Sequence, residues 1–119
     1  MMDGRLGFAR WGILVPRHFE QFHISASACE HILGKHQVTL DEVLEAAESS
    51  AVYQRAGDES SESLNPTGEP RYLIAGRTST GRRLWIIVAD EGGGEARIIT
   101  AREVGGHAER ARHRRMRGD

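Results

Sequence analysis

Arginine is concentrated between residues 71 and 102 of the sequence. This stretch holds Arg71, Arg77, Arg82, Arg83, Arg97 and Arg102. A guanidinium group is planar and offers paired N–H donors, so it holds phosphate oxygens through two parallel charge-assisted hydrogen bonds. Arginines at this density on a short stretch of chain favour an anionic ligand.

A metal-independent cleavage of RNA would need a base and an acid beside such cations. His36 is the best single candidate, because an unperturbed imidazole titrates near ~6.5 and works in either form at neutral pH. Its alternative role is to cap a carbonyl at a helix end. Glu109 could act as a base or orient an arginine, or it could simply pair with His113 or a neighbouring arginine on a helix.

Other chemistries fit the sequence less well. There is one cysteine, Cys29, so no cysteine pair exists, and the pairs His18/His23 and His31/His36 are each five residues apart, which does not suit two ligands on one helical face; we therefore expect no metal site. Gly92–Gly94 lies between two expected strands and does not open a helix, which disfavours a nucleotide-binding loop. Cys29 is expected to be a buried, inert thiol and Trp85 to belong to the core. No cofactor is expected.

Length and charge narrow the class of protein. The chain has 119 residues, which predicts one domain, and it has no apolar run near the ~20 residues of a membrane helix. We therefore expect a cytoplasmic protein with no membrane partner. Up to Pro70 there are 5 basic and 11 acidic residues, and from Arg71 onward there are 11 basic and 6 acidic ones. The basic second half favours a polyanion or an acidic partner.

The arginines must be positioned by a small sheet. Three runs rich in β-branched and aromatic residues, separated by glycine-containing gaps, predict a three-stranded antiparallel meander from Arg71 to Arg102. Ser79–Gly81 suits a tight hairpin with Gly81 at positive φ. In a regular strand Arg97 and Arg102 point to opposite faces. Arg77 and Arg97 are the favoured pair for one site, on the sheet face opposite the helices.

Two helices are expected before the sheet. Ser27 and Glu30 fit a capping box for the first, which breaks at Gln37–Val38. Thr39 and Glu42 fit a second capping box, followed by an apolar period of i, i+3, i+4, i+7 that should end near Ser49–Ser50.

The remaining segments are less regular. Phe19–Ile24 and Ala51–Gln54 are possible short strands, and residues 10–15 a further one within an N-terminal extension, residues 1–18. Residues 55–70 are polar and acidic with two prolines, which predicts a flexible loop. Residues 108–117 are basic with almost no apolar stripe, which predicts a solvated helix or a frayed tail; His107 and His113 would then be solvated.

The order of four short motifs resembles the BrnT family of small ribonuclease toxins, which have a RelE-like fold. The motifs are Lys35-His36-x-Val38 with Glu42-Val43, Ile74-Ala-Gly-Arg77-Thr78, Gly81-Arg82-x-Leu84 and Arg97-Ile-Ile-Thr-Ala-Arg102. The resemblance spans about residues 22–110, within a domain of residues 19–117. Arg112-His113 stands where the family has a tyrosine. About twenty extra residues precede the part that resembles the family, and the loop between the helices and the sheet is longer than is typical.

The resemblance implies an α+β fold: two N-terminal helices packed on an antiparallel meander of three or four strands, with a C-terminal basic helix. It implies a bacterial type II toxin, a metal-independent endoribonuclease whose substrate is RNA. Its partner would be a DNA-binding, ribbon-helix-helix-like antitoxin. Together with the chemistry above it yields an expected catalytic set of His36, Arg77, Arg97 and Glu109. The expected phosphate-binding set is Lys35, Arg82, Thr100 and Arg102. The alternative is a non-catalytic basic module on the same fold that binds nucleic acid or protein.

Overall fold

The computed structural model describes residues 14–15, 19–49, 51–54 and 70–119. The expected flexible loop (residues 55–70, except Pro70) and nearly all of the N-terminal extension lie outside the described residues. Within the described part, no helix is long and apolar enough to cross a membrane.

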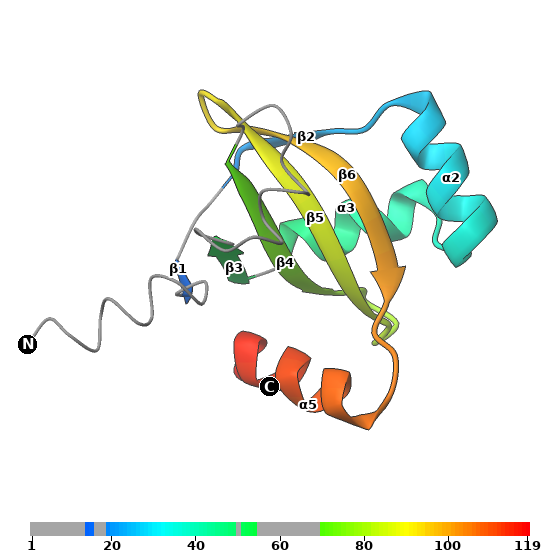
Figure 1. Cartoon of the computed structure of the whole chain (residues 1–119), viewed down its shortest axis with the longest axis vertical. Coiled ribbons are helices and arrows are strands. Elements are labelled where there is room, and N and C mark those ends of the chain that lie inside the picture. The colour runs from blue at the N-terminus through cyan, green and yellow to red at the C-terminus, as the bar shows by residue number, and fades with distance from the viewer. Residues whose placement is uncertain (1–13, 16–18, 50, 55–69) are drawn as a thin grey trace, which may run out of the picture.

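The sheet is built around the expected meander. Strands β4 (Arg71–Arg77), β5 (Arg83–Gly92) and β6 (Glu95–Glu103) pair antiparallel in sequence order. Short strands enlarge it to six, in the order β1-β3-β4-β5-β6-β2 (Figure 1). They are β1 (Leu14–Val15), β3 (Ala51–Gln54) and β2 (Gln21–His23). The expected strand at residues 19–24 thus forms, although it is shorter, and it pairs parallel with β6.

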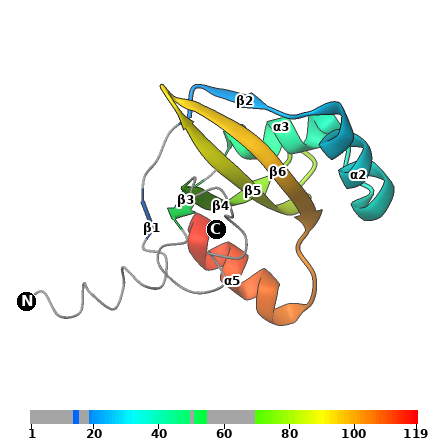
Figure 2. The same cartoon turned by 45° about the horizontal axis from the view of Figure 1, so that its top comes forward.

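Two helices cover one face of the sheet. Helix α2 (Ala26–His36) lies beside β6, and α3 (Leu40–Glu48) packs on β4 and β5 (Figures 1 and 2). The expected capping box of Thr39 and Glu42 is present in α3. The expected cap of α2 was misplaced by two residues: Ser25, not Ser27, is the N-cap, and its hydroxyl accepts the N–H of Ala28. An extended backbone at Ser25 leaves its side chain free to reach that N–H.

A buried apolar core fills the space between these helices and the sheet. It includes Ile32 of α2, Val43 of α3, and Ile74, Ile86 and Ile98 of the strands, all at most 1% exposed. Burying side chains of this size contributes about 1.5–3 kcal/mol each. Cys29, expected to be buried, is only half-buried at the margin of this layer.

The C-terminal helix corrects a prediction. Helix α5 (His107–Arg117) is neither a solvated helix nor a frayed tail, because it packs on the other face of the sheet (Figure 2). Met116 is 3% exposed and joins a second apolar cluster with Leu73, Ala75 and Trp85. The sequence hides this contact because one methionine and one histidine, three residues apart, are the only buried side chains of the helix. The expected α+β arrangement is otherwise confirmed.

A bulge in β6 corrects a second prediction. Ile87 pairs with Thr100 while Val88 pairs with Ile98, so Ile99 is an extra residue on one strand. An extra residue shifts the alternation of side chains by one. Arg97 and Arg102, expected on opposite faces, therefore share the face that α5 covers.

Candidate active site: an arginine–carboxylate pair in a cleft between the sheet and two helices

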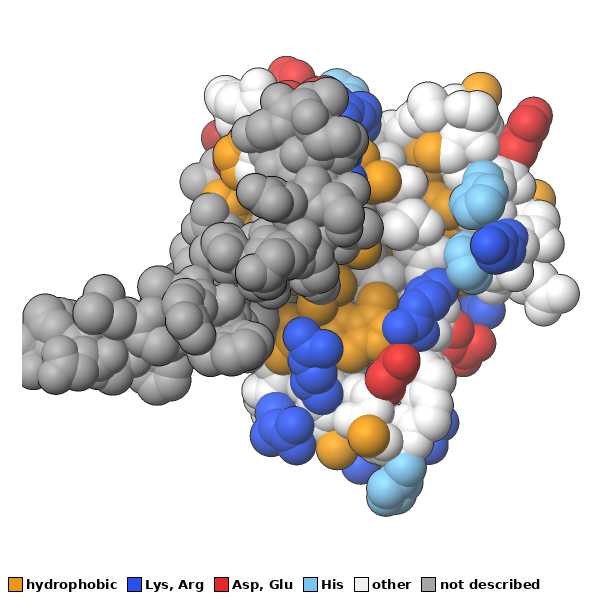
Figure 3. All heavy atoms as spheres, in the orientation of Figure 1, with side chains coloured by type: hydrophobic (Ala, Val, Ile, Leu, Met, Phe, Trp, Pro, Cys, Tyr) orange, Lys and Arg blue, Asp and Glu red, His pale blue; other side chains and the backbone are white. Residues whose placement is uncertain are grey.

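A cleft of about 250 Å³ opens on the sheet face opposite the α2–α3 core. Its floor is apolar and its rim carries basic, acidic and histidine side chains, a mixture visible on this face in Figure 3. Strands β4, β5 and β6 supply Leu73, Trp85, Ile87, Thr100 and Arg102, the end of α2 supplies His36, and α5 supplies Glu109 and Arg112.

Glu109 is the polar centre of this cleft. Its Oε1 accepts hydrogen bonds from Nη1 of Arg102 at 3.0 Å, from Nε1 of Trp85 at 3.0 Å and from the N–H of Gly105 at 2.9 Å. Its Oε2 accepts from Nη2 of Arg102 at 3.0 Å. The bonds from Arg102, Gly105 and Trp85 outweigh desolvation and lower the pKa of Glu109 to about 2. So low a pKa makes this carboxylate a poor base, and its geometry makes it an orienter of Arg102.

Arg102 is held on one edge and open on the other. Its two terminal nitrogens bind the Glu109 carboxylate, and Nη1 also donates to the carbonyl of Glu103 at 3.2 Å. Among the described residues, Nε–H and the second N–H of Nη2 have no protein acceptor. These two donors form the side edge of the guanidinium, a fork that fits two oxygens of one phosphate. The side chain is 46% exposed, so a ligand can reach that edge.

His36 reaches the cleft from the last turn of α2, where the helix ends at Gln37 in the left-handed conformation. Its pKa is lowered from 6.5, mainly by burial and then by the charges of His31, Lys35 and Arg102. The imidazole is therefore neutral at pH 7 and has a ring nitrogen able to accept a proton.

Arg112 and Trp85 form the opposite wall. The guanidinium carbon of Arg112 lies 5.3 Å from the centroid of the Trp85 ring, which is a cation–π contact. Trp85 is 6% exposed, so the expectation that it belongs to the core is correct, and it also lines the cleft. Sequence reasoning did not select Arg112, although its spacing of three from Glu109 on a helix places the two on one side.

His113, expected to be solvated, is fully buried beneath this wall. Its Nε2 donates to the carbonyl of Leu84 and its Nδ1 accepts from Arg83, each at 3.1 Å, and its ring meets Trp85 edge to face at 5.0 Å. Burial, the largest cause, lowers its pKa and keeps it neutral. Its place is structural: it fixes α5 on the sheet.

The other expected site residues lie outside the cleft lining. Arg82 forms ion pairs with Glu42 of α3 at 2.8 Å and with Glu103 of β6 at 3.3 Å, and so connects the helix to the sheet. Arg97 pairs with Glu91 at 2.7 Å. Arg77 faces Asp119, and Lys35 is exposed beside His36.

The favoured pair, Arg77 and Arg97, is not brought together. Ala89 pairs with both Arg97 and Arg71, and Arg71 lies at the far end of β4 from Arg77. At ~3.3 Å per residue, this separates the two arginines by roughly 20 Å along the strands. One phosphate cannot contact both. Of the expected site residues, the cleft collects His36, Thr100, Arg102 and Glu109.

One group of potential cation ligands occurs in the described part of the chain. His23, Glu91 and Glu95 have ligand atoms within 4.8 Å of one another on the surface. Glu95 hydrogen-bonds His23, and Glu91 pairs with Arg97. These protein contacts account for the arrangement without an ion.

Known proteins resemble this chain in fold rather than in sequence. No protein-family model matches the sequence, and no curated protein matches it. A crystal structure of the Brucella abortus ribonuclease toxin BrnT does match, with a TM-score of 0.52 and 13% sequence identity over 72% of this chain and 97% of that one. The chain has the BrnT fold. The resemblance expected from the four motifs is thereby confirmed at the level of the fold.

Proposed function

We propose that this protein is an endoribonuclease that cleaves RNA without a metal ion, and that it acts as the toxin of a type II toxin–antitoxin pair. One observation carries the proposal: Arg102, oriented by Glu109, offers an open guanidinium edge in the same cleft as the neutral imidazole of His36. RNA cleavage requires a group that binds the phosphate, here Arg102, and a group that accepts a proton, here His36. The BrnT fold supports the same conclusion.

In the proposed reaction, His36 removes the proton from a 2′-hydroxyl, whose oxygen attacks the adjacent phosphorus. The bond to the 5′-oxygen breaks, and a cyclic phosphate forms. Arg102 stabilises the charge that builds on the phosphate oxygens, and a preorganised donor of this kind is worth about 3–4 kcal/mol. His36, protonated in the first step, then donates that proton to the leaving 5′-oxygen.

Glu109 is a positioning residue in this proposal. Four hydrogen bonds fix its carboxylate, and it fixes Arg102 in turn. Thr100 and Arg112 border the same space and would contact the sugar–phosphate strand on either side of the scissile bond. Lys35, Arg77, Arg82 and Arg97, outside the lining, would act on the RNA strand at a distance from the reacting phosphate, or on the fold.

An acidic antitoxin is the proposed protein partner. The arginines of α5 (Arg110, Arg112, Arg114, Arg115 and Arg117) lie on one side of the sheet, and the acidic residues of α3 (Asp41, Glu42, Glu45 and Glu48) lie on the other. The side that holds the cleft is therefore the basic one. A DNA-binding, ribbon-helix-helix-like antitoxin with an acidic segment would cover the cleft and compete with RNA.

A second candidate is a module that binds RNA without cutting it. It is favoured by the absence of a tyrosine where the family has one, since Arg112 and His113 stand there. His36 then has no second proton donor beside it in the cleft lining.

The test is cleavage of a labelled RNA by purified protein, with growth arrest on expression as a second readout. We expect His36→Ala and Arg102→Ala each to lower kcat by about 10²–10³-fold. Glu109→Gln should lower kcat with little change in KM. Arg110→Ala is the matched control, because Arg110 is exposed on α5 and does not line the cleft. Salt-sensitive binding without any strand scission by the wild-type protein would instead establish the binding module.

A further inference from the structure

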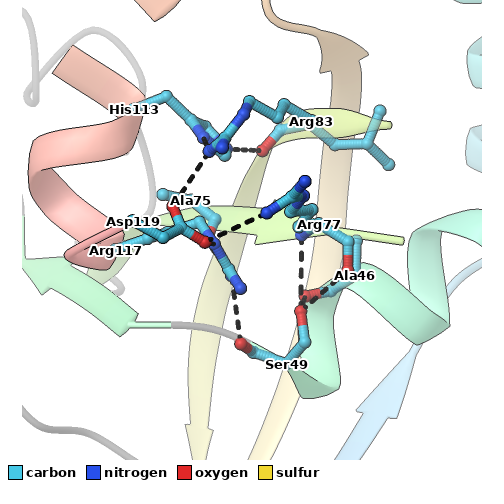
Figure 4. Close-up of polar contacts among 9 residues, drawn as sticks. Ala46, Ser49, Ala75, Arg77, Arg83, His113, Arg117 and Asp119 are labelled. Atoms are coloured by element: carbon cyan, nitrogen blue, oxygen red, sulfur yellow. Dashed lines mark hydrogen bonds and ion pairs between the residues drawn. The ribbon is translucent and has the colours of Figure 1, made fainter. Parts of the chain in front are cut away.

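Three arginines meet around one carboxylate on the same side of the sheet as the cleft but outside its lining. Arg77 ends β4, Arg83 begins β5 and Arg117 ends α5. Asp119 lies among them: its Oδ1 accepts from Arg83 at 3.0 Å, and its Oδ2 accepts from Arg117 at 3.2 Å and from Arg77 at 3.5 Å (Figure 4). We call these three arginines the Arg77–Arg83–Arg117 cluster.

The cluster carries more positive charge than its partner balances. Arg77 and Arg83 are directly opposite each other on paired strands, and like charges in that position repel. Among the ion pairs of the described residues, Asp119 is the one carboxylate that all three share. One negative charge thus faces three positive ones. An anion with a second charge and a third oxygen would match the three guanidinium groups better.

Two of the three guanidinium groups are fixed by groups other than Asp119. Nη1 of Arg117 donates to the carbonyls of Ser49 and Ala75, each at 3.0 Å, and Nη1 of Arg83 donates to Nδ1 of His113. Their side chains are 15% and 13% exposed. Because these acceptors are neutral, they hold the arginines in place without cancelling their charge. Arg83 and Arg117 would therefore keep their places if Asp119 left the site, whereas Asp119 is the side-chain partner of Arg77 among the described residues.

The Asp119 side chain is bound by the three arginines and lies at the end of α5. Asp119 follows Gly118, whose left-handed backbone ends α5, and the N–H groups of both residues bond to the carbonyl of Arg114. Its side chain is 34% exposed. A side-chain rotation, without unfolding of the helix, is enough to withdraw the carboxylate, and such rotations are fast.

We propose that the Arg77–Arg83–Arg117 cluster is a phosphate-binding site. The carboxylate of Asp119 occupies this site until a phosphate displaces it. The phosphate has two possible sources, free inorganic phosphate and a phosphate group of an RNA strand. Arginine forks bind either by the same hydrogen bonds. A competitor inside the protein weakens the apparent affinity, because the apparent Kd is the intrinsic Kd divided by the fraction of time for which the site is free.

The experiment is a calorimetric titration of the full chain with inorganic phosphate. Asp119→Asn keeps the shape of the side chain and removes its charge, so we expect it to bind phosphate at least tenfold more tightly than the wild type. Asp41→Asn is the matched control: it makes the same charge change on α3, exposed and away from the cluster, and should leave the affinity unchanged within about twofold. Adding Arg77→Ala to Asp119→Asn should reverse the gain.

Folding of each variant is checked by thermal unfolding, and phosphate should raise the Tm of Asp119→Asn more than that of the wild type. Equal affinities for Asp119→Asn and wild type, or an equal gain in Asp41→Asn, would overturn the proposal. A second titration with an uncleavable 2′-deoxy-substituted RNA identifies the source. Tighter binding of that strand by Asp119→Asn assigns the site to RNA, and an unchanged RNA affinity beside tighter phosphate binding assigns it to free phosphate. Neither readout depends on cleavage, so a failure of the proposed enzyme activity would be seen separately.

Discussion

At the scale of single residues, the environment of a side chain decides which role it can take. Glu109 and His36 are both titratable and both line the cleft, yet one has a pKa near 2 and the other a pKa below 6.5. Four donors bind the carboxylate, whereas the imidazole is partly removed from water and lies near other positive groups. The pair therefore divides into a fixed anion that orients Arg102 and a neutral imidazole, which is the base of the proposed reaction.

This division predicts the pH dependence of cleavage. His36 must be neutral to accept a proton, and its pKa is lowered from 6.5 by burial and by neighbouring positive charges. The value of kcat/KM should therefore rise with pH through a single ionisation below 6.5 and stay level at neutral pH. A pH–rate profile from pH 4.5 to 8 measures it. His31→Ala removes one of those charges, so the midpoint should move upward in that variant; a wild-type midpoint above 6.5 would contradict the assignment.

At the scale of elements, two close contacts place the cleft. Helix α3 approaches β4 so closely that a Cβ on Gly76 would lie 2.6 Å from the carbonyl oxygen of Ala46. On the other face, α5 packs through Met116 and His113 and so delivers Glu109 to Arg102. The glycine of the Gly76-Arg77-Thr78 motif is thus explained by packing rather than by chemistry.

Gly76→Ala should therefore destabilise the fold. The obstructing atom is backbone, so the helix must shift, and overpacking of this kind costs about 1–3 kcal/mol in the free energy of unfolding. Denaturant unfolding at pH 7 measures it. Gly34→Ala is the matched control: in α2 nothing lies within 4 Å of its added Cβ, so the same change should stabilise by about 0.5–1 kcal/mol. Equal effects at the two positions would refute the packing argument.

At the scale of the whole molecule, the sheet separates charge. The acidic helix α3 and the basic helix α5 cover opposite faces, and the cleft opens on the side of α5. The net charge of −1 therefore conceals a basic side and an acidic side, and the RNA of the proposed function would approach the basic one.

This separation predicts how RNA binding responds to salt. If Arg102 and Arg112 each neutralise one phosphate of a single strand, log K should fall with log salt concentration with a slope of about −1.4, and Arg102→Ala should reduce the slope by about 0.7. Fluorescence anisotropy with an uncleavable RNA at several salt concentrations gives both slopes. A slope that does not change in Arg102→Ala would show that this arginine does not contact a phosphate.

Local sequence was enough to predict helices α2 and α3, the meander and the capping box of Thr39 and Glu42, because each follows from residue periods and short-range hydrogen bonds. It also selected His36, Thr100, Arg102 and Glu109, all of which line one cleft.

The tertiary structure alone decided which arginines are neighbours. One extra residue in β6, Ile99, put Arg97 and Arg102 on the same face, and strand register kept Arg77 and Arg97 apart. Register and bulges depend on contacts between distant segments, which residue types within one strand do not specify. The same holds for α5, where two buried side chains turned a basic segment into the wall of the cleft.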